Sequence, residues 1–229
     1  MSNRLQSRWL VRWGGSPMWG WLLIALATIT ASAVLIVVST SSPATEPPRR
    51  PVILFYGDSL TSGSFSNSEG EAFPGRVRTA LSANSAVVSQ KGVRTYSFLT
   101  NHPRPPVESD IAVVELGTND VAVTPLDRFS ENYSRVIHSV KPESGNVLCV
   151  SVWINPVKAQ AYNSVIEKVC ASVGGYFVDV TDLYKDPRNR GPAGAVVDGE
   201  IIDNFHPNNR GHRLIAQRIV SVIYDNGIG

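Results

Sequence analysis

Short apolar runs alternate with helix-patterned segments along most of this chain, and this alternation restricts the possible folds more than any other feature. The run Val52–Tyr56 (VILFY) contains no polar residue and is bounded by Pro51 and Gly57. Strands without polar alternation are typical of a parallel sheet that is covered on both faces. We predict strands of this kind over residues 52–56, 86–89, 111–116, 147–153 and 176–180.

Helices are predicted between these strands from apolar residues spaced three and four positions apart. The segments are 73–83, a helix carrying Phe129 to Val140 that Pro142 closes, 159–173 and 208–225, whereas 182–200 is predicted to be irregular. Strands alternating with helices at this spacing predict an α/β domain. We expect a flavodoxin-like three-layer α/β/α sandwich with a central parallel sheet of about five strands.

The N-terminal part of the sequence predicts a membrane segment. Residues 19–38 are twenty residues without a charge, enough for a helix to cross the roughly 30 Å core of a bilayer. Arg4, Arg8 and Arg12 precede the segment, so its N-terminus is expected in the cytoplasm and the rest of the chain outside it. We expect a retained single-pass anchor; the alternative is cleavage near Ser42–Ala44 and secretion.

The predicted organisation is therefore a cytoplasmic basic tail (1–18), a transmembrane helix (19–38), a Ser/Thr/Pro-rich linker (39–50) and one catalytic domain (51–229). Five of the 21 basic residues but one of the 19 acidic residues lie before residue 51, so the domain itself carries 16 basic and 18 acidic residues. This balance gives no support to nucleic-acid binding.

The two cysteines, Cys149 and Cys170, lie in a predicted strand and in the helix that follows it. A strand followed by a returning helix would bring them near each other, and a disulfide is compatible with an extracytoplasmic compartment. Two small buried side chains that never pair are an equally good interpretation.

Candidate catalytic residues gather at one edge of the predicted sheet. Ser59, Gly92 and Asn119 each fall just past the carboxyl end of a predicted strand, where open α/β sheets bind ligands. Asp203 and His206 lie before the last predicted helix. Taken singly, each polar residue could be an ordinary turn, capping or surface residue.

Together these residue types fit nucleophilic catalysis. A serine hydroxyl needs an adjacent base, and the neutral imidazole of His206 can accept the Ser59 proton. Asp203 can orient the imidazole through its other ring nitrogen. No cofactor is expected, and no metal, because a site built from Asp203, His206 and His212 lacks the usual ligand spacing.

Four motifs in chain order make the domain resemble the SGNH (GDSL) hydrolase family. They are GDSL at 57–60, a glycine at Gly92, GTND at 117–120 and DNFHPN at 203–208. The resemblance covers essentially all of 51–229. It implies an oxyanion hole formed by the backbone N–H groups of Ser59 and Gly92 and by the side-chain amide of Asn119.

The sequence thus predicts a membrane-anchored, extracytoplasmic serine esterase with a Ser-His-Asp triad. No long apolar insertion that could act as a lipase lid is apparent, which favours short-chain acyl groups on envelope carbohydrate as substrate. The alternatives are an O-acyltransferase that uses a sugar acceptor at the same site, a lipase or thioesterase, and a non-catalytic binding module.

Overall fold

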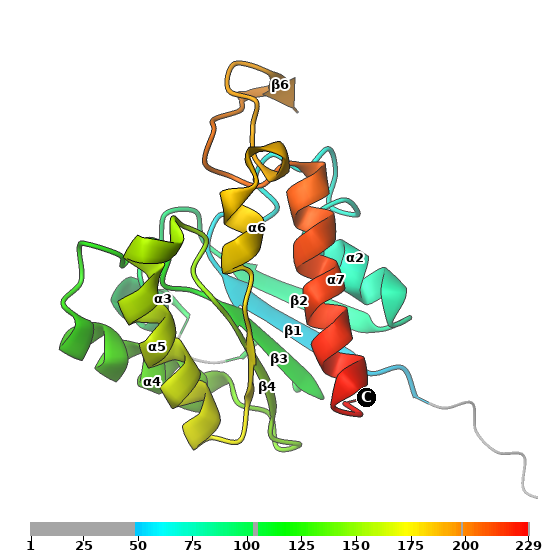
Figure 1. Cartoon of the computed structure of the whole chain (residues 1–229). Coiled ribbons are helices and arrows are strands. Elements are labelled where there is room, and N and C mark those ends of the chain that lie inside the picture. The colour runs from blue at the N-terminus through cyan, green and yellow to red at the C-terminus, as the bar shows by residue number, and fades with distance from the viewer. Residues whose placement is uncertain (1–48, 103–104, 198, 229) are drawn as a thin grey trace, which may run out of the picture. The chain divides into compact units, whose positions relative to one another are not determined.

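The computed structural model describes residues 49–102, 105–197 and 199–228. Five parallel strands form one sheet in the order β2-β1-β3-β4-β5 (Figure 1). This is the flavodoxin-like order, so the predicted α/β fold and strand number are confirmed. The strands are β1 (Val52–Gly57), β2 (Asn84–Ser89), β3 (Ile111–Glu115), β4 (Asn146–Val150) and β5 (Tyr176–Val178).

Helices cover both faces of the sheet (Figure 1). α3 (Thr95–Asn101), α4 (Leu126–Val140) and α5 (Pro156–Ser172) pack on one face. α2 (Phe73–Ala80), α6 (Thr181–Lys185) and α7 (Asn209–Asp225) pack on the other.

The unbroken apolar pattern of β1 follows from these two layers. Leu54 and Tyr56 lie in the hydrophobic cluster with α3, α4 and α5, whereas Ile53 and Phe55 lie in the cluster with α2 and α7. All four side chains are fully buried. A strand that is covered on both faces has no place for a solvated polar residue.

Capping residues set the start of two long helices. The Asn155 side chain accepts a hydrogen bond from Val157 N–H, and Pro156 occupies the first helical position, so α5 begins before the predicted residue 159. The Asn208 side chain accepts from the N–H groups of Arg210 and Gly211 and caps α7.

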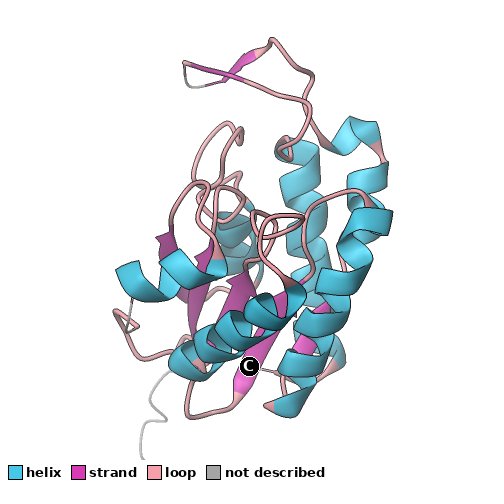
Figure 2. Ribbon diagram, turned by 90° about the vertical axis from the view of Figure 1, so that its left-hand side faces the viewer, coloured by secondary structure: helices cyan, strands magenta, loops and turns pink. Residues whose placement is uncertain are grey.

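The segment predicted to be irregular contains short elements. Besides α6 it holds a 3₁₀ turn, η1 (Pro187–Asn189), and a small antiparallel hairpin of β6 (Val196–Val197) and β7 (Glu200–Ile201). Figure 2 shows this hairpin extending beyond the end of the sheet. Strands of two residues leave no detectable periodicity, so the sequence could not reveal them.

Cys149 on β4 and Cys170 on α5 form a disulfide, with their Cα atoms 6.1 Å apart. The structure thus decides between the two interpretations of these cysteines. The predicted membrane helix (19–38) and most of the predicted linker lie outside the described residues. Within the part of the chain that is described, no helix has the length and apolar character needed to cross a membrane.

Candidate active site

Ser59 lies in a tight turn that follows β1. A Cβ atom on Gly57 would lie 1.9 Å from Thr61 Oγ1 and 2.6 Å from the Glu115 carbonyl oxygen, so only glycine fits there. The buried Asp58 carboxylate accepts a hydrogen bond of 2.9 Å from Leu60 N–H and holds the turn closed. Ser59 is 7% exposed, so the nucleophile lies in a well-packed turn.

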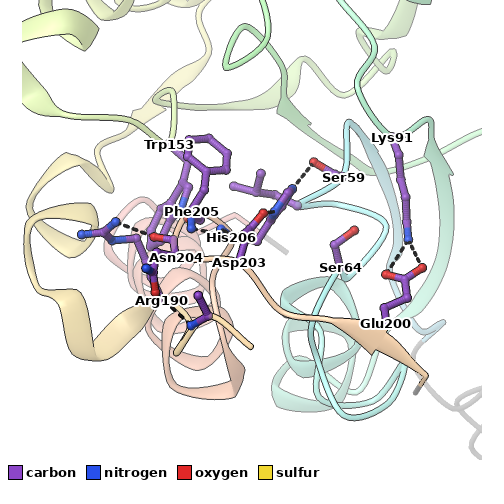
Figure 3. Close-up of polar contacts among 12 residues, drawn as sticks. Ser59, Ser64, Lys91, Trp153, Arg190, Glu200, Asp203, Asn204, Phe205 and His206 are labelled. Atoms are coloured by element: carbon purple, nitrogen blue, oxygen red, sulfur yellow. Dashed lines mark hydrogen bonds and ion pairs between the residues drawn. The ribbon is translucent and has the colours of Figure 1, made fainter. Parts of the chain in front are cut away.

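The structure brings Ser59, His206 and Asp203 together (Figure 3). Ser59 Oγ lies 3.0 Å from His206 Nε2, and His206 Nδ1 lies 2.7 Å from Asp203 Oδ2. Ser59 and His206 are 147 residues apart in the sequence, and only the fold brings them together. The distances fit a nucleophile, a base and an orienting carboxylate.

The carboxylate of Asp203 is held by its own turn. Its Oδ1 atom accepts hydrogen bonds of 2.8 Å from the N–H groups of Phe205 and His206, which leaves Oδ2 for the imidazole. Burial raises the pKa of Asp203, but these backbone hydrogen bonds and the His206 side chain outweigh it and hold the pKa below its ordinary value. Asp203 is therefore ionised at neutral pH.

Aromatic side chains that the sequence did not identify fix the His206 ring. The rings of Phe65 and Phe205 meet it edge-on, with centroids 5.0 and 5.2 Å away. Trp153 Nε1 donates a hydrogen bond of 2.8 Å to the Phe205 carbonyl oxygen and so anchors this loop to the end of β4 (Figure 3). These contacts join distant segments, and no local sequence signal reports them.

Two backbone N–H groups at this edge of the sheet, those of Ser59 and Gly92, are candidate oxyanion donors. Among the described residues, neither Ser59 N–H nor Gly92 N–H donates a hydrogen bond to the protein. Gly92 has a φ of +71° and open space where a Cβ would stand, so its backbone is accessible. Such donors are what a developing oxyanion requires.

Asn119 lies at the same edge of the sheet, but its side-chain amide already donates hydrogen bonds to other groups of the protein. Its Nδ2 donates to Asp58 Oδ2 at 2.8 Å and to the Val93 carbonyl oxygen at 3.1 Å. Both amide hydrogens are thus committed, so donation to an oxyanion requires the longer bond, to Val93, to be given up.

A second buried carboxyl group, that of Glu115, interacts with Asp58. Glu115, at the end of β3, is buried, and its Oε2 accepts a hydrogen bond of 2.9 Å from Thr61 Oγ1. Burial raises the pKa of Asp58 to about 6, against hydrogen bonds from Leu60 N–H and Glu115. Burial and the nearby Asp58 charge raise the pKa of Glu115 well above its ordinary value.

The protonation of Glu115 resolves an unpaired atom. Glu115 Oε1 is buried and has no hydrogen-bond partner among the described residues. The raised pKa of Glu115 favours its protonated carboxyl group, which can donate to Asp58, whereas a carboxylate could not. The sequence places Glu115 in an apolar run, but it does not show that this carboxyl group lies against that of Asp58.

The loop that carries Gly92 is joined to the β6–β7 hairpin. Lys91 Nζ lies 2.9 Å from Glu200 Oε1 across the site (Figure 3). Val196 and Ile201 of the hairpin are exposed.

The remaining candidate is His212, which the fold separates from the triad. It is buried on α7, with Nε2 3.2 Å from the Ser64 carbonyl oxygen and Nδ1 3.4 Å from Phe73 N. Within the described ranges, no three His, Cys, Asp or Glu side chains gather as metal ligands.

The fold and this arrangement of serine, histidine and carboxylate define a serine hydrolase. A model of the GDSL-like lipase/acylhydrolase family matches residues 55–214, and the chain belongs to this family. A comparison with curated proteins finds no match.

Several solved structures share the fold. A family two carbohydrate esterase from Clostridium thermocellum, in complex with cellohexaose, has a TM-score of 0.60 and 16% identity, with 80% of this chain and 66% of that chain covered. TesA has a TM-score of 0.60 and 17% identity, covering 76% and 98% of the two chains. A two-domain esterase active on acetylated mannans has a TM-score of 0.59 and 20% identity, covering 77% and 49%.

At these identities the likeness to the solved structures is one of fold. The chain spans slightly less than two thirds of the length of the carbohydrate esterase and about half of the mannan esterase.

Proposed function

We propose that this protein hydrolyses O-acyl esters with Ser59 as nucleophile, His206 as general base and Asp203 as the residue that orients the imidazole. The observation that carries the proposal is the continuous chain of contacts from Ser59 Oγ to His206 Nε2, at 3.0 Å, and from His206 Nδ1 to Asp203, at 2.7 Å. The backbone donors of Ser59 and Gly92 and the amide of Asn119 form the oxyanion hole.

Acylation begins when Ser59 Oγ attacks the ester carbonyl carbon and its proton passes to His206 Nε2. Asp203 stabilises the imidazolium, and the oxyanion hole stabilises the negative charge on the carbonyl oxygen. The C–O bond to the alcohol then breaks, and His206 gives its proton to the leaving oxygen. Water, deprotonated by His206, attacks the acyl-enzyme and releases the carboxylic acid and Ser59.

We infer that the acyl group is short and is borne by carbohydrate of the cell envelope. The predicted cleft-lining segments contain no long apolar insertion that could act as a lid, and two esterases that act on carbohydrate share the fold, which supports this inference. Residues 19–38 would anchor the enzyme in the membrane through a single helix, with 39–50 as a linker and the catalytic domain from residue 51 outside the cytoplasm. The Cys149–Cys170 disulfide fits that compartment.

Labelling with a fluorophosphonate probe tests the nucleophile, because the probe reacts with an activated serine whatever the natural substrate. We expect the full-length protein to be labelled and to release acetate from a chromogenic acetyl ester, and Ser59→Ala to do neither. Undiminished esterase activity in Ser59→Ala would show that the site is wrong. A mature N-terminus near residue 45, found by mass spectrometry, would rule out the retained anchor.

A further inference from the structure

A surface pocket of about 430 Å³ lies between α3 and α4, outside the triad. Polar and basic side chains from both helices and from the loop before α4 line it. The lining side chains include Arg94, Tyr96, Arg128, Asn132 and Arg135.

The pocket contains an amide that is free to bind a ligand. Asn132 on α4 is 8% exposed, and its side chain makes no hydrogen bond with any described residue. Its amide atoms are not fully buried, so they reach the solvent in the pocket. A ligand can therefore use the two donors and one acceptor of this amide in place of water. Asn132 thus suits a polar ligand.

The rim of the pocket is positively charged. Arg128 forms an ion pair with Glu131, with Nη1 and Oε2 3.2 Å apart. Arg94 and Arg135 are exposed, and neither guanidinium group has an ion pair or hydrogen bond among the described residues. Three arginines against one glutamate leave a net charge that favours an anion.

Tyr96 adds a flat apolar surface to this polar setting. Its side chain is 64% exposed, although tyrosine usually buries much of its ring. An exposed aromatic ring beside hydrogen-bonding groups suits a sugar, which has an apolar face and polar edges. The combination of amide, guanidinium groups and aromatic ring disfavours an acyl chain as ligand, because desolvating these polar groups would go uncompensated.

The pocket is connected to the oxyanion loops by direct contacts. The buried Asp120 carboxylate accepts from Thr95 N–H and Thr95 Oγ1, both at 3.0 Å, which joins the start of α3 to the loop after β3. The Asn119 amide donates to the Val93 carbonyl oxygen, one residue before Arg94. These contacts place the loop after β3, which carries Asn119, next to the start of α3, where Arg94 and Tyr96 lie.

We propose that the pocket between α3 and α4 binds an acidic sugar unit, bearing a carboxylate or a phosphate, of the glycan whose ester is cleaved at Ser59. The inference rests on the proposed esterase function and specifies in addition that the substrate is negatively charged. The guanidinium groups of Arg94 and Arg135 bind the anion, Asn132 binds sugar hydroxyl groups, and Tyr96 packs against the ring.

Binding can be measured without turnover, by calorimetry on full-length Ser59→Ala protein. The probes are oligogalacturonate for the carboxylate, a glycerol-phosphate oligomer for the phosphate, and cello-oligosaccharide as the neutral comparison. We expect one acidic probe to bind more tightly than the neutral one, and the double change Arg94→Gln/Arg135→Gln to weaken that binding roughly tenfold. The double change Arg78→Gln/Arg213→Gln removes two charges on the other face of the sheet and is the matched control.

Turnover provides the second readout. On an acetylated acidic oligosaccharide, we expect the pocket variants to raise KM more than they lower kcat, and added salt to raise KM in the same direction. Equal binding of acidic and neutral probes, or equal weakening by the control variant, would overturn the subsite. Lack of esterase activity on every ester would instead refute the proposed function, while the calorimetry still decides the pocket.

Discussion

The side-chain amide of Asn119 donates a hydrogen bond of 2.8 Å to the buried carboxylate of Asp58. The same carboxylate accepts from Leu60 N–H at 2.9 Å, inside the turn that carries Ser59. Asp58 therefore connects the turn of the nucleophile to the amide that we place in the oxyanion hole, and it sets the distance between them.

The change Asp58→Asn should disturb this connection. Asp58 uses one carboxylate oxygen to accept from Leu60 N–H and the other to accept from Asn119, whereas asparagine has only one acceptor oxygen. We expect kcat/KM to fall about a hundredfold, similar to the loss of one oxyanion donor, with little change in KM. Steady-state kinetics on a chromogenic acetyl ester measure this. Asp127→Asn, which removes an exposed carboxylate on α4, is the control, and equal effects of the two changes would argue against the role of Asp58.

Glu115 should make stability depend on pH. Its folded pKa is raised, so the folded state keeps a proton that the unfolded state loses above pH ~4.3. The free energy of unfolding therefore falls as pH rises from there toward the folded pKa. Glu115→Gln cannot ionise, and its amide can still donate to Asp58 and accept from Thr61. We expect this variant to lose that pH-dependent decrease in urea unfolding between pH 5 and pH 9.

Glu115→Ala separates this effect from simple packing. It leaves the buried Thr61 hydroxyl without its acceptor and opens a space beside Asp58, so we expect it to be destabilised at every pH. A Gln variant with the same pH slope as the wild type would show that Glu115 is not protonated in the folded state.

The sheet, and the positions of Ser59, Gly92 and Asn119 at its edge, could be predicted because their signals are local. The apolar run of β1 reports burial on both faces, and Ser59, Gly92 and Asn119 follow three strands whose ends must meet at one edge in a parallel sheet. His206 was assigned by chemistry and by family motifs, not by any local pattern. Its distance to Ser59 came from the structure alone.

What the sequence could not reveal depends on contacts between distant segments. Glu115 is an acidic residue in an apolar run, and only the packing of β1 against β3 shows that it lies near Asp58, which helps to raise its pKa. The edge-on contacts of Phe65 and Phe205 with His206 are equally non-local. The start of α5 was missed for a different reason, since Asn155-Pro156 is a capping signal without an apolar pattern.

The disulfide between Cys149 and Cys170 should stabilise the domain, because it closes a loop with a sequence separation of 21. Loop-closure entropy suggests about 3 kcal/mol. We expect a reducing agent to lower the free energy of unfolding of the wild type by roughly this amount, measured by urea titration. The double change Cys149→Ala/Cys170→Ala should be less stable and insensitive to the reducing agent. Insensitivity of the wild type would contradict the bond.

His212 should make the protein sensitive to acid. Its imidazole is buried between α7 and α2, and burial lowers its pKa to about 4. Between that value and the ordinary histidine pKa of ~6.5 the unfolded state binds a proton that the folded state does not. Stability contributed by the neutral ring is therefore complete above pH ~6.5 and is lost as pH falls toward 4.

The change His212→Gln tests this contribution, because glutamine can still bond to Ser64 and Phe73 but cannot take up a proton. The expected loss in the wild type is about 3 kcal/mol between pH 7 and pH 4, and the variant should lack that part. The raised pKa of Asp58 acts in the opposite direction in both proteins, so the difference between their unfolding curves isolates His212. His138→Gln, at an exposed position on α4, should leave the curve unchanged. Parallel curves for wild type and His212→Gln would mean that the buried ring does not titrate as stated.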